Sequence, residues 1–150
     1  MKAVESKDRT VNSHKQLNDF KSEIASFGIV ISEEEWHHLS GLIEVKTANK
    51  REVIFSQTEL CHHVIYLMSG ITATIYLYDD KEVVTRFFQK GNFNTNIVSA
   101  ESKSLASDIL VAITDIEYLL LPFNFFLDSF FHSNTFGLFV RKKIMRMIIE

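Results

Sequence analysis

The hydrophobic positions of the chain begin with a helical spacing. Leu17, Phe20, Ile24 and Phe27 repeat every three or four residues, which is the period of one buried helix face. Gly28 follows where such a helix would end. The pattern therefore predicts an N-terminal helix that packs one face against the rest of the domain.

A second, shorter helix is predicted directly afterwards. Ser32 is followed three residues later by Glu35, which is the pattern of a capping box at a helix N-terminus. Trp36 and Leu39 belong to the helix that this box begins. Two small helices thus precede the remaining pattern.

From Leu42 onwards the pattern changes to short apolar segments typical of β-strands. They are rich in Val, Ile, Thr, Tyr and Phe, and polar residues or glycine separate them. The segments are IEVKTA, EVIFSQ, VIYLMSG, ITATIYLY, EVVTRFF, SDILVAI and IEYLLL. About seven strands, with helices only before and after them, predict a mainly β fold, an antiparallel sandwich or barrel, and exclude a parallel α/β sheet.

One of these segments, ITATIYLY, alternates between apolar and polar side chains, which predicts one buried and one solvent-facing side. The predicted buried side consists of Ile71, Ala73, Ile75 and Leu77, and the solvent-facing side of Thr72, Thr74, Tyr76 and Tyr78. Asp79–Asp80 then predicts a hairpin turn onto EVVTRFF.

After Pro122 the helical spacing returns. An aromatic run is expected to anchor the end of the sandwich to a long helix over residues 135–150. The run consists of Phe123, Phe125, Phe126, Phe130 and Phe131.

The long helix carries two apolar stripes. The first, expected to face the core, consists of Phe136, Val140, Ile144, Met147 and Ile148. The second has the spacing of a coiled-coil seam and consists of Leu138, Met145 and Ile149, with Lys142 at one of its polar positions. Two interpretations stay open: a dimer helix formed by the second stripe, or one broad face against the same domain. The basic residues Arg141, Lys142, Lys143 and Arg146 are interpreted as a solvated surface rather than a DNA contact.

Composition narrows the class of protein. The chain has 150 residues, 46% of them hydrophobic, which is enough for the core of one domain. A net charge of −3 gives no general attraction to nucleic acid or to an anionic membrane. Cys61 is the one cysteine, which excludes an internal disulfide and fits a reducing cytoplasm. No apolar run is long enough for a transmembrane helix.

The residues show no catalytic constellation. His62 and His63 are adjacent in a strand segment and point to opposite faces, and His37 and His38 lie about 100° apart on a helix, so neither pair suits a metal ion. Cys61 is interpreted as a small buried hydrophobe. We therefore expect no enzyme, no metal and no cofactor; a small jelly-roll (cupin-like) enzyme with an unrecognised site is the weakest alternative.

Three segments carry a resemblance to a known family. They are IYLMSGITATIYLYDDKEVVTRFF, QKGNF and VAITDIEYLLL. In this order they resemble the cyclic-nucleotide-binding domain of the Crp/Fnr transcription regulator superfamily, and the resemblance runs roughly from Phe20 to the C-terminus. It implies an antiparallel jelly-roll, also called a double-stranded β-helix, with two short N-terminal helices and a long C-terminal helix.

The polar, mixed-charge N-terminus and the resemblance together indicate a domain organisation and partners. Residues 1–14 would be a disordered tail and residues 15–150 a sensor domain, with a C-terminal helix that starts at about residue 135 and is expected to be truncated. In this family the β-domain senses a small ligand, the long helix makes a homodimer, and a following helix-turn-helix binds DNA. No helix-turn-helix is recognised in this chain, and no membrane partner is expected.

The expected ligand loop departs from the family pattern of Phe-Gly-Glu followed by Arg-Ser/Thr-Ala. Thr95 stands in the place of the glycine, Asn96 of the glutamate and Ala106 of the arginine, whereas Ser107 is retained. Asp108 adds a negative charge close to the expected phosphate position. Loss of a buried charged partner costs about 2–5 kcal/mol of binding, so we expect the site to be degenerate for cyclic AMP.

The ligand of this loop is therefore open. The candidate pocket residues are Phe93, Asn94, Thr95, Asn96, Lys103, Ser107 and Asp108. Lys103 would replace the missing arginine only if the loop register shifts. The neutral donors and acceptors suit an unidentified small polar ligand, and the alternative is a solvated loop without a ligand. The chain is then either the sensor part of a regulator or a stand-alone, ligand-free interaction module.

Overall fold

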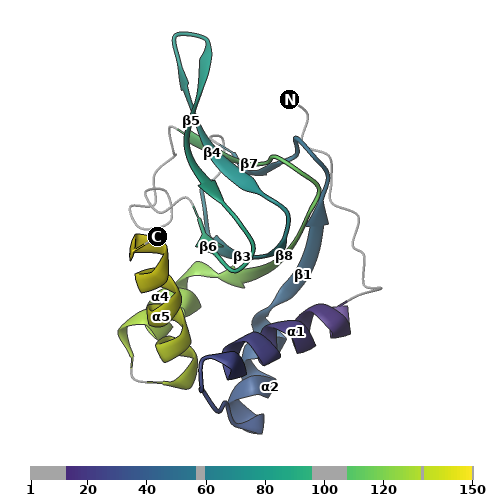
Figure 1. Cartoon of the computed structure of the whole chain (residues 1–150), viewed down its shortest axis with the longest axis vertical. Coiled ribbons are helices and arrows are strands. Elements are labelled where there is room, and N and C mark those ends of the chain that lie inside the picture. The colour runs from purple at the N-terminus through teal and green to yellow at the C-terminus, as the bar shows by residue number, and fades with distance from the viewer. Residues whose placement is uncertain (1–12, 57–59, 96–107, 133, 150) are drawn as a thin grey trace.

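The fold consists of two four-stranded sheets with helices at both chain ends (Figure 1). The computed structural model describes residues 13–56, 60–95, 108–132 and 134–149. The helices are α1 (Ser13–Ser26), α2 (Glu33–Leu42), α4 (Phe123–Phe131) and α5 (Thr135–Ile149). The strands are β1 (Glu44–Ala48), β2 (Val53–Phe55), β3 (His63–Ser69), β4 (Thr72–Tyr78), β5 (Lys81–Phe88), β6 (Phe93–Asn94), β7 (Asp108–Ala112) and β8 (Ile116–Pro122).

The strand order makes the two sheets an antiparallel sandwich. One sheet has the order β1-β8-β3-β6 and the other β2-β7-β4-β5, and every recorded pairing is antiparallel. Apart from the β4–β5 hairpin, strands that follow one another in the chain therefore alternate between the two sheets, as in a jelly-roll. The sequence-based expectation of a mainly β jelly-roll with flanking helices is confirmed, as a sandwich rather than a closed barrel.

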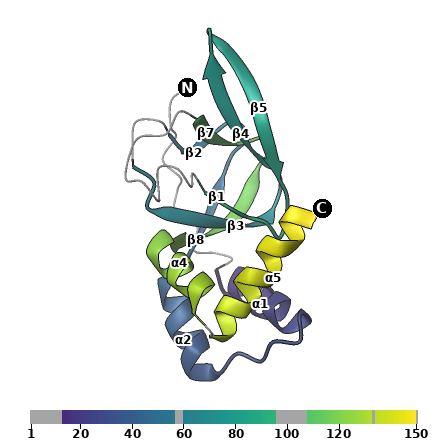
Figure 2. The same ribbon diagram turned by 90° about the vertical axis from the view of Figure 1, so that its left-hand side faces the viewer.

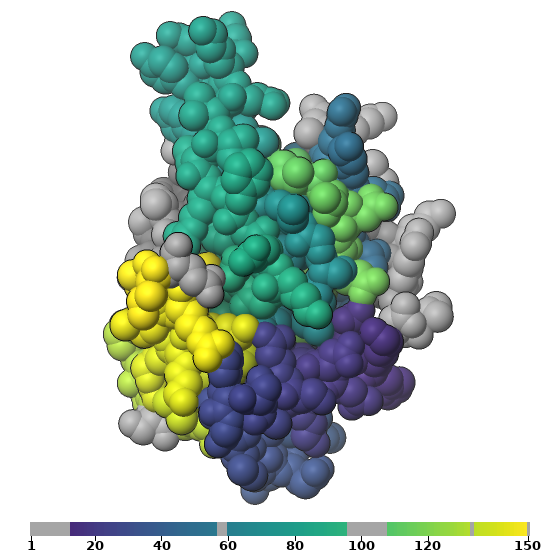
Figure 3. Space-filling model, in the orientation of Figure 1, coloured from purple at the N-terminus to yellow at the C-terminus, as the bar shows by residue number. Residues whose placement is uncertain are grey.

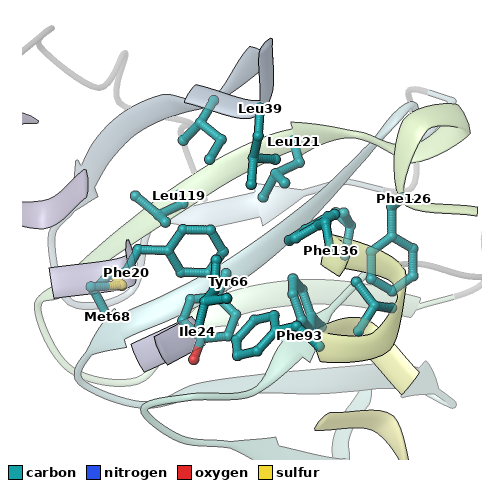
Figure 4. Packing of buried hydrophobic residues seen from close by; sticks show 14 of the residues in the cluster. Phe20, Ile24, Leu39, Tyr66, Met68, Phe93, Leu119, Leu121, Phe126 and Phe136 are labelled. Carbon is teal, nitrogen blue, oxygen red and sulfur yellow. The ribbon is translucent and has the colours of Figure 1, made fainter. Parts of the chain in front are cut away.

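The helices cover the outer face of the β1-β8-β3-β6 sheet, so the domain has two cores (Figure 2). In β3, Tyr66 and Met68 face the helices, whereas Ile65 and Leu67 face the opposite sheet. The helix-side core is aromatic, as Figure 4 shows around Phe20 and Tyr66. The two rings lie 4.9 Å apart between centroids. Bulky rings from α1, β3 and α5 thereby join the chain ends to the sheet.

The alternation expected for residues 71–78, which include β4, is wrong at three positions. Thr72 is completely buried, whereas Ile71 and Leu77 are 39% and 44% exposed. The outer half of the β4–β5 hairpin extends beyond the sandwich (Figures 1 and 3), so side chains there have no opposite layer to contact. A register shift between Thr74 and Ile75 also interrupts the regular pairing with β5.

Two turns occur as the sequence indicates. Gly28 adopts φ +74° directly after α1, a backbone conformation that glycine adopts without steric cost. Asp79 and Asp80 adopt φ 47° and 61° between β4 and β5. Two successive positive φ values match the twist of a two-residue hairpin, and Asp tolerates them better than most residues.

The capping box before α2 forms only in part. The Glu35 backbone N–H donates to Ser32 Oγ at 3.1 Å, as expected. The Glu35 carboxylate, however, accepts a hydrogen bond from the Phe136 backbone N–H at 3.1 Å. Glu35 therefore caps α5 from a distant part of the chain.

The C-terminal helices follow the expected pattern with two exceptions. Phe136 and Val140 are buried, but Ile148, expected to face the core, is 71% exposed because it lies in the last turn of α5, where little packs against the helix. Phe131, expected to anchor the sandwich, is 72% exposed at the end of α4. Within the described residues, no helix is long and apolar enough to cross a membrane.

Candidate functional site

The expected ligand loop is described at its two ends. Phe93, Asn94 and Thr95 lie in and just after β6, and Asp108 is the first residue of β7. The two strands belong to facing sheets. Asn96, Lys103, Ala106 and Ser107 lie outside the described residues, so the predictions for them remain predictions.

β6 is a two-residue strand that no sequence pattern indicated. It pairs with β3, with Asn94 opposite Ile65 and Phe93 opposite Tyr66. Phe93 packs on Tyr66 at 4.7 Å and on Phe126 at 5.1 Å between ring centroids. Phe93 therefore belongs to the helix-side core (Figure 4). Its contact with Phe126 connects β6, and so the start of the loop, to α4.

Asn94 and Thr72 form a buried polar pair between the two sheets. The Thr72 hydroxyl donates to Asn94 Oδ1 at 3.3 Å, and both residues are buried. The Asn94 Nδ2 amide is buried and has no hydrogen-bond partner among the described residues. A buried donor without a partner costs about 1–3 kcal/mol. Asn94 thus presents a neutral donor at the start of the candidate loop.

Thr95 is held by local hydrogen bonds. Its hydroxyl donates to the His63 carbonyl at 2.6 Å and lies 3.3 Å from Cys61 Sγ. Its φ is not positive, so the backbone here does not need glycine. Cys61 is buried, which confirms the interpretation of a packed cysteine.

The basic cluster of α5 is not a simple solvated surface, and that interpretation is wrong for Arg141 and Lys143, which are half-buried, whereas Lys142 and Arg146 are exposed. Arg141 Nη1 donates to the carbonyls of Phe130 at 3.1 Å and His132 at 2.8 Å, where α4 ends. The Arg146 guanidinium lies 4.4 Å from the Phe27 ring centroid. The sequence spacing alone does not reveal these partners, because they come from other elements.

The Lys143 side chain of this cluster is largely buried. Its ammonium pairs with the Glu23 carboxylate of α1, and only 12% of the Lys143 side chain is exposed. The rings of Phe27, Tyr66 and Phe139 lie 5.2, 5.5 and 5.8 Å from the ammonium. The ion pair therefore joins α5 to α1, and the three aromatic rings pack around its ammonium.

Gly91, in the turn between β5 and β6, lies beside the Glu23–Lys143 ion pair. Its φ is +87°, and its N–H donates to the Leu67 carbonyl at 2.8 Å. A Cβ at this position would lie 3.0 Å from Lys143 Nζ and 3.4 Å from Glu23 Oε1. The turn that leads to the candidate loop thus lies directly over the contact between α1 and α5.

The residues of the expected dimer helix lie on the exposed side of α5. Leu138 is 40%, Met145 55% and Ile149 77% exposed, and Lys142 is also exposed. Within the single chain, this stripe is therefore not used as one broad face against the domain.

Metal binding finds no geometric support in the described part of the chain. No group of three or more His, Cys, Asp or Glu side chains there could hold a metal ion. His62 is exposed and His63 is half-buried at the start of β3.

The fold is shared with solved cyclic-nucleotide-binding domains. The chain is similar to such a domain from Methylobacillus flagellatus, with 12% identity and TM-score 0.64 over 92% of this chain and 78% of that chain. It is similar to the sensor domain of the transcriptional regulator DNR from Pseudomonas aeruginosa, with 15% identity and TM-score 0.59 over 78% and 83%. It is also similar to the Thermus thermophilus catabolite activator protein, with 17% identity and TM-score 0.57 over 79% of this chain and 54% of that chain.

These likenesses confirm the resemblance at the level of the fold. No family model and no curated protein matches the chain. The neighbours are described as binding or sensor domains and a regulatory protein. The chain therefore has the fold of the cyclic-nucleotide-binding domains found in Crp/Fnr regulators.

Proposed function

We propose that this chain is a non-catalytic sensor and dimerisation domain of a Crp/Fnr-type transcription regulator in the cytoplasm. The observation that supports the proposal most is the similarity of the fold, which has two short helices before a jelly-roll sandwich and a helix after it, to the DNR sensor domain. Contacts between the β5–β6 turn, α1 and α5 would transmit a change in the sandwich to the terminal helix.

Cyclic AMP is a poor ligand for this domain. Thr95 occupies the position where a glycine N–H would approach a phosphate, and its hydroxyl is bonded to the His63 carbonyl. Asn96 and Ala106 supply neither the carboxylate nor the guanidinium that a cyclic nucleotide requires. Titration calorimetry with cyclic AMP should show no binding at micromolar concentrations. A dissociation constant in that range would overturn this part of the proposal.

Dimerisation is proposed through the exposed stripe of α5, namely Leu138, Lys142, Met145 and Ile149. Changing Met145→Asp would place a charge in an apolar seam and weaken the dimer by about ten-fold or more. Sedimentation velocity measures the change in the monomer–dimer equilibrium.

The matched control is Val30→Asp, because Val30 is an exposed apolar residue that lies outside α5. It should leave the equilibrium unchanged. Equal effects of the two variants, or a monomeric parent chain, would contradict a dimer through α5.

A stand-alone interaction module is the second candidate function. It is favoured by the exposed apolar side chains on the β4–β5 hairpin, which are Tyr76, Leu77, Tyr78, Val83, Val84 and Phe87. In that case no small molecule tested would change the monomer–dimer equilibrium.

A further inference from the structure

A pocket of about 250 Å³ lies between the two sheets, where β1, β3 and β8 face β2. Its lining includes Lys46, Glu52, Phe55, His63, Tyr118 and Leu120. Phe93, Asn94, Thr95 and Asp108 are not among its lining residues. The described end of the candidate ligand loop therefore adjoins the pocket, because Thr95 contacts Cys61 and His63, but it does not line it.

Three polar side chains occupy inward positions in this sheet. Tyr118 belongs to the core between the sheets, and Lys46 lies directly opposite it on β1. His63 lies two residues before Ile65, on the same face of β3. Polar groups at such positions cost stability unless they are bonded, so their presence at one end of the sandwich requires an explanation.

Tyr118 supplies a neutral hydrogen-bond donor. The residue is 5% exposed, and its hydroxyl has no hydrogen-bond partner among the described residues. Burial raises the pKa of this hydroxyl to about 12, and the negative charges of Glu52 and Glu44 contribute. The Tyr118 hydroxyl therefore stays protonated at neutral pH and lines the pocket as an available donor.

Together with Tyr118, Lys46 and His63 form the polar wall of the pocket. The Lys46 ammonium lies 3.6 Å from Glu44 Oε2 and is part of the lining. Burial lowers the pKa of His63, with further lowering by His62 and Lys46 and an opposing effect of Glu44, so the imidazole is neutral at pH 7. Glu52 already accepts the Asn49 backbone N–H at 2.9 Å. The wall thus offers two neutral donors and one cation, which is paired with Glu44, beside the buried Glu52 carboxylate.

We propose that this pocket binds a small organic acid. Its carboxylate would accept hydrogen bonds from the Tyr118 hydroxyl and the Lys46 ammonium, and its apolar body would contact Phe55 and Leu120. The volume lies just below the usual range of about 300–1,000 Å³ for ligand pockets, so it suits a small acid better than a nucleotide. The inference rests on the proposed sensor function and adds a ligand class to it.

The test is titration of the isotope-labelled 150-residue chain with sodium benzoate, followed by two-dimensional NMR at constant ionic strength. Benzamide serves as the uncharged analogue of the same shape. Benzoate should cause saturable shifts at residues around the pocket, and benzamide should bind at least about ten-fold more weakly. No saturable shift with benzoate, or equal binding of benzamide, would overturn the proposal.

Two variants locate the site. Tyr118→Phe should weaken benzoate binding about five-fold, the value of one hydrogen bond, and Lys46→Met about ten-fold or more. Lys50→Met, an exposed lysine outside the lining, should leave binding unchanged. Unchanged binding in both pocket variants, when their NMR spectra retain the folded pattern, would also overturn the proposal. Sedimentation of the same samples tests dimerisation independently, so failure of the ligand class is distinguishable from failure of the sensor proposal.

Discussion

At the scale of single residues, Lys143 has the most consequential environment in the described chain. Its ammonium is buried among three rings and pairs with Glu23, so each charge depends on the other for compensation. A lysine in a basic run is usually solvated, and the linear sequence gives no sign that Glu23 lies opposite. The role of Lys143 in joining α5 to α1 therefore follows from its burial beside Glu23, and not from the number of charges in the basic run.

Replacing Lys143 by Met should lower the free energy of unfolding by about 1–3 kcal/mol, because Glu23 would keep a partly buried charge without its partner. Urea denaturation measures the change. The double variant Glu23→Gln/Lys143→Met should recover part of the loss.

Lys50→Met is the control for this experiment. Lys50 is exposed and lies outside the proposed dimer stripe, so its replacement should change stability by less than about 0.5 kcal/mol. A loss for Lys50→Met equal to that for Lys143→Met would show that the ion pair is not the cause.

At the scale of the elements, Glu35 links two helices that lie far apart in the sequence. The pattern Ser32-x-x-Glu35 predicts that the carboxylate turns back to its own helix, and the Ser32 half of that prediction is confirmed. The carboxylate instead accepts from the Phe136 N–H at the start of α5. A negative charge is favourable there because the first N–H groups of a helix lack partners within it.

Glu35→Ala should therefore destabilise the domain by about 1 kcal/mol, the usual value of a helix cap. Glu34→Ala removes a neighbouring carboxylate from the same first turn of α2 and is expected to have a smaller effect. Thermal unfolding of both variants makes the comparison. If Glu34→Ala were equally destabilising, the cause would be the charge of α2 rather than the cap of α5.

The β4 strand shows the limit of periodicity at the same scale. Its alternation identifies a strand, and the hairpin turn at Asp79–Asp80 forms as expected. Which side is buried, however, depends on where the opposite sheet ends, and beyond that point both sides of the hairpin are exposed (Figure 3).

At the scale of the whole molecule, the two cores both contain a buried tyrosine. Burial and the nearby Glu23 carboxylate raise the pKa of Tyr66, although its hydroxyl has no hydrogen-bond partner among the described residues. Burial also raises the pKa of Tyr118 to about 12. Both groups have an ordinary pKa of 10.0.

Stability should accordingly fall as the pH rises above 10. The unfolded chain then loses protons that the folded chain keeps, so the unfolded state binds fewer protons and the free energy of unfolding decreases. Each tyrosine contributes about 1.4 kcal/mol per pH unit while only its unfolded form ionises, and for Tyr118 this continues to about pH 12. Urea unfolding between pH 8 and about 11 measures the slope. Tyr118→Phe should make the slope shallower, and an unchanged slope would contradict this assignment.

The sequence by itself determined the order of the elements. Local signals, such as helical spacing before Gly28, strand alternation and the Asp79–Asp80 turn, act between neighbours in the chain, so they indicate helices, strands and turns. The motif order was enough to indicate the jelly-roll. β6 could not be predicted, because a strand of two residues is too short to show a periodic pattern.

Only the tertiary structure decided which side chains meet. The Glu23–Lys143 pair, the cap from Glu35 to α5 and the polar wall around Tyr118 join residues that are distant in the chain. Such contacts depend on how helices and sheets pack, and no local pattern encodes them. The short range of sequence signals therefore explains why the fold could be predicted, whereas the buried ion pair and the pocket between the sheets could not.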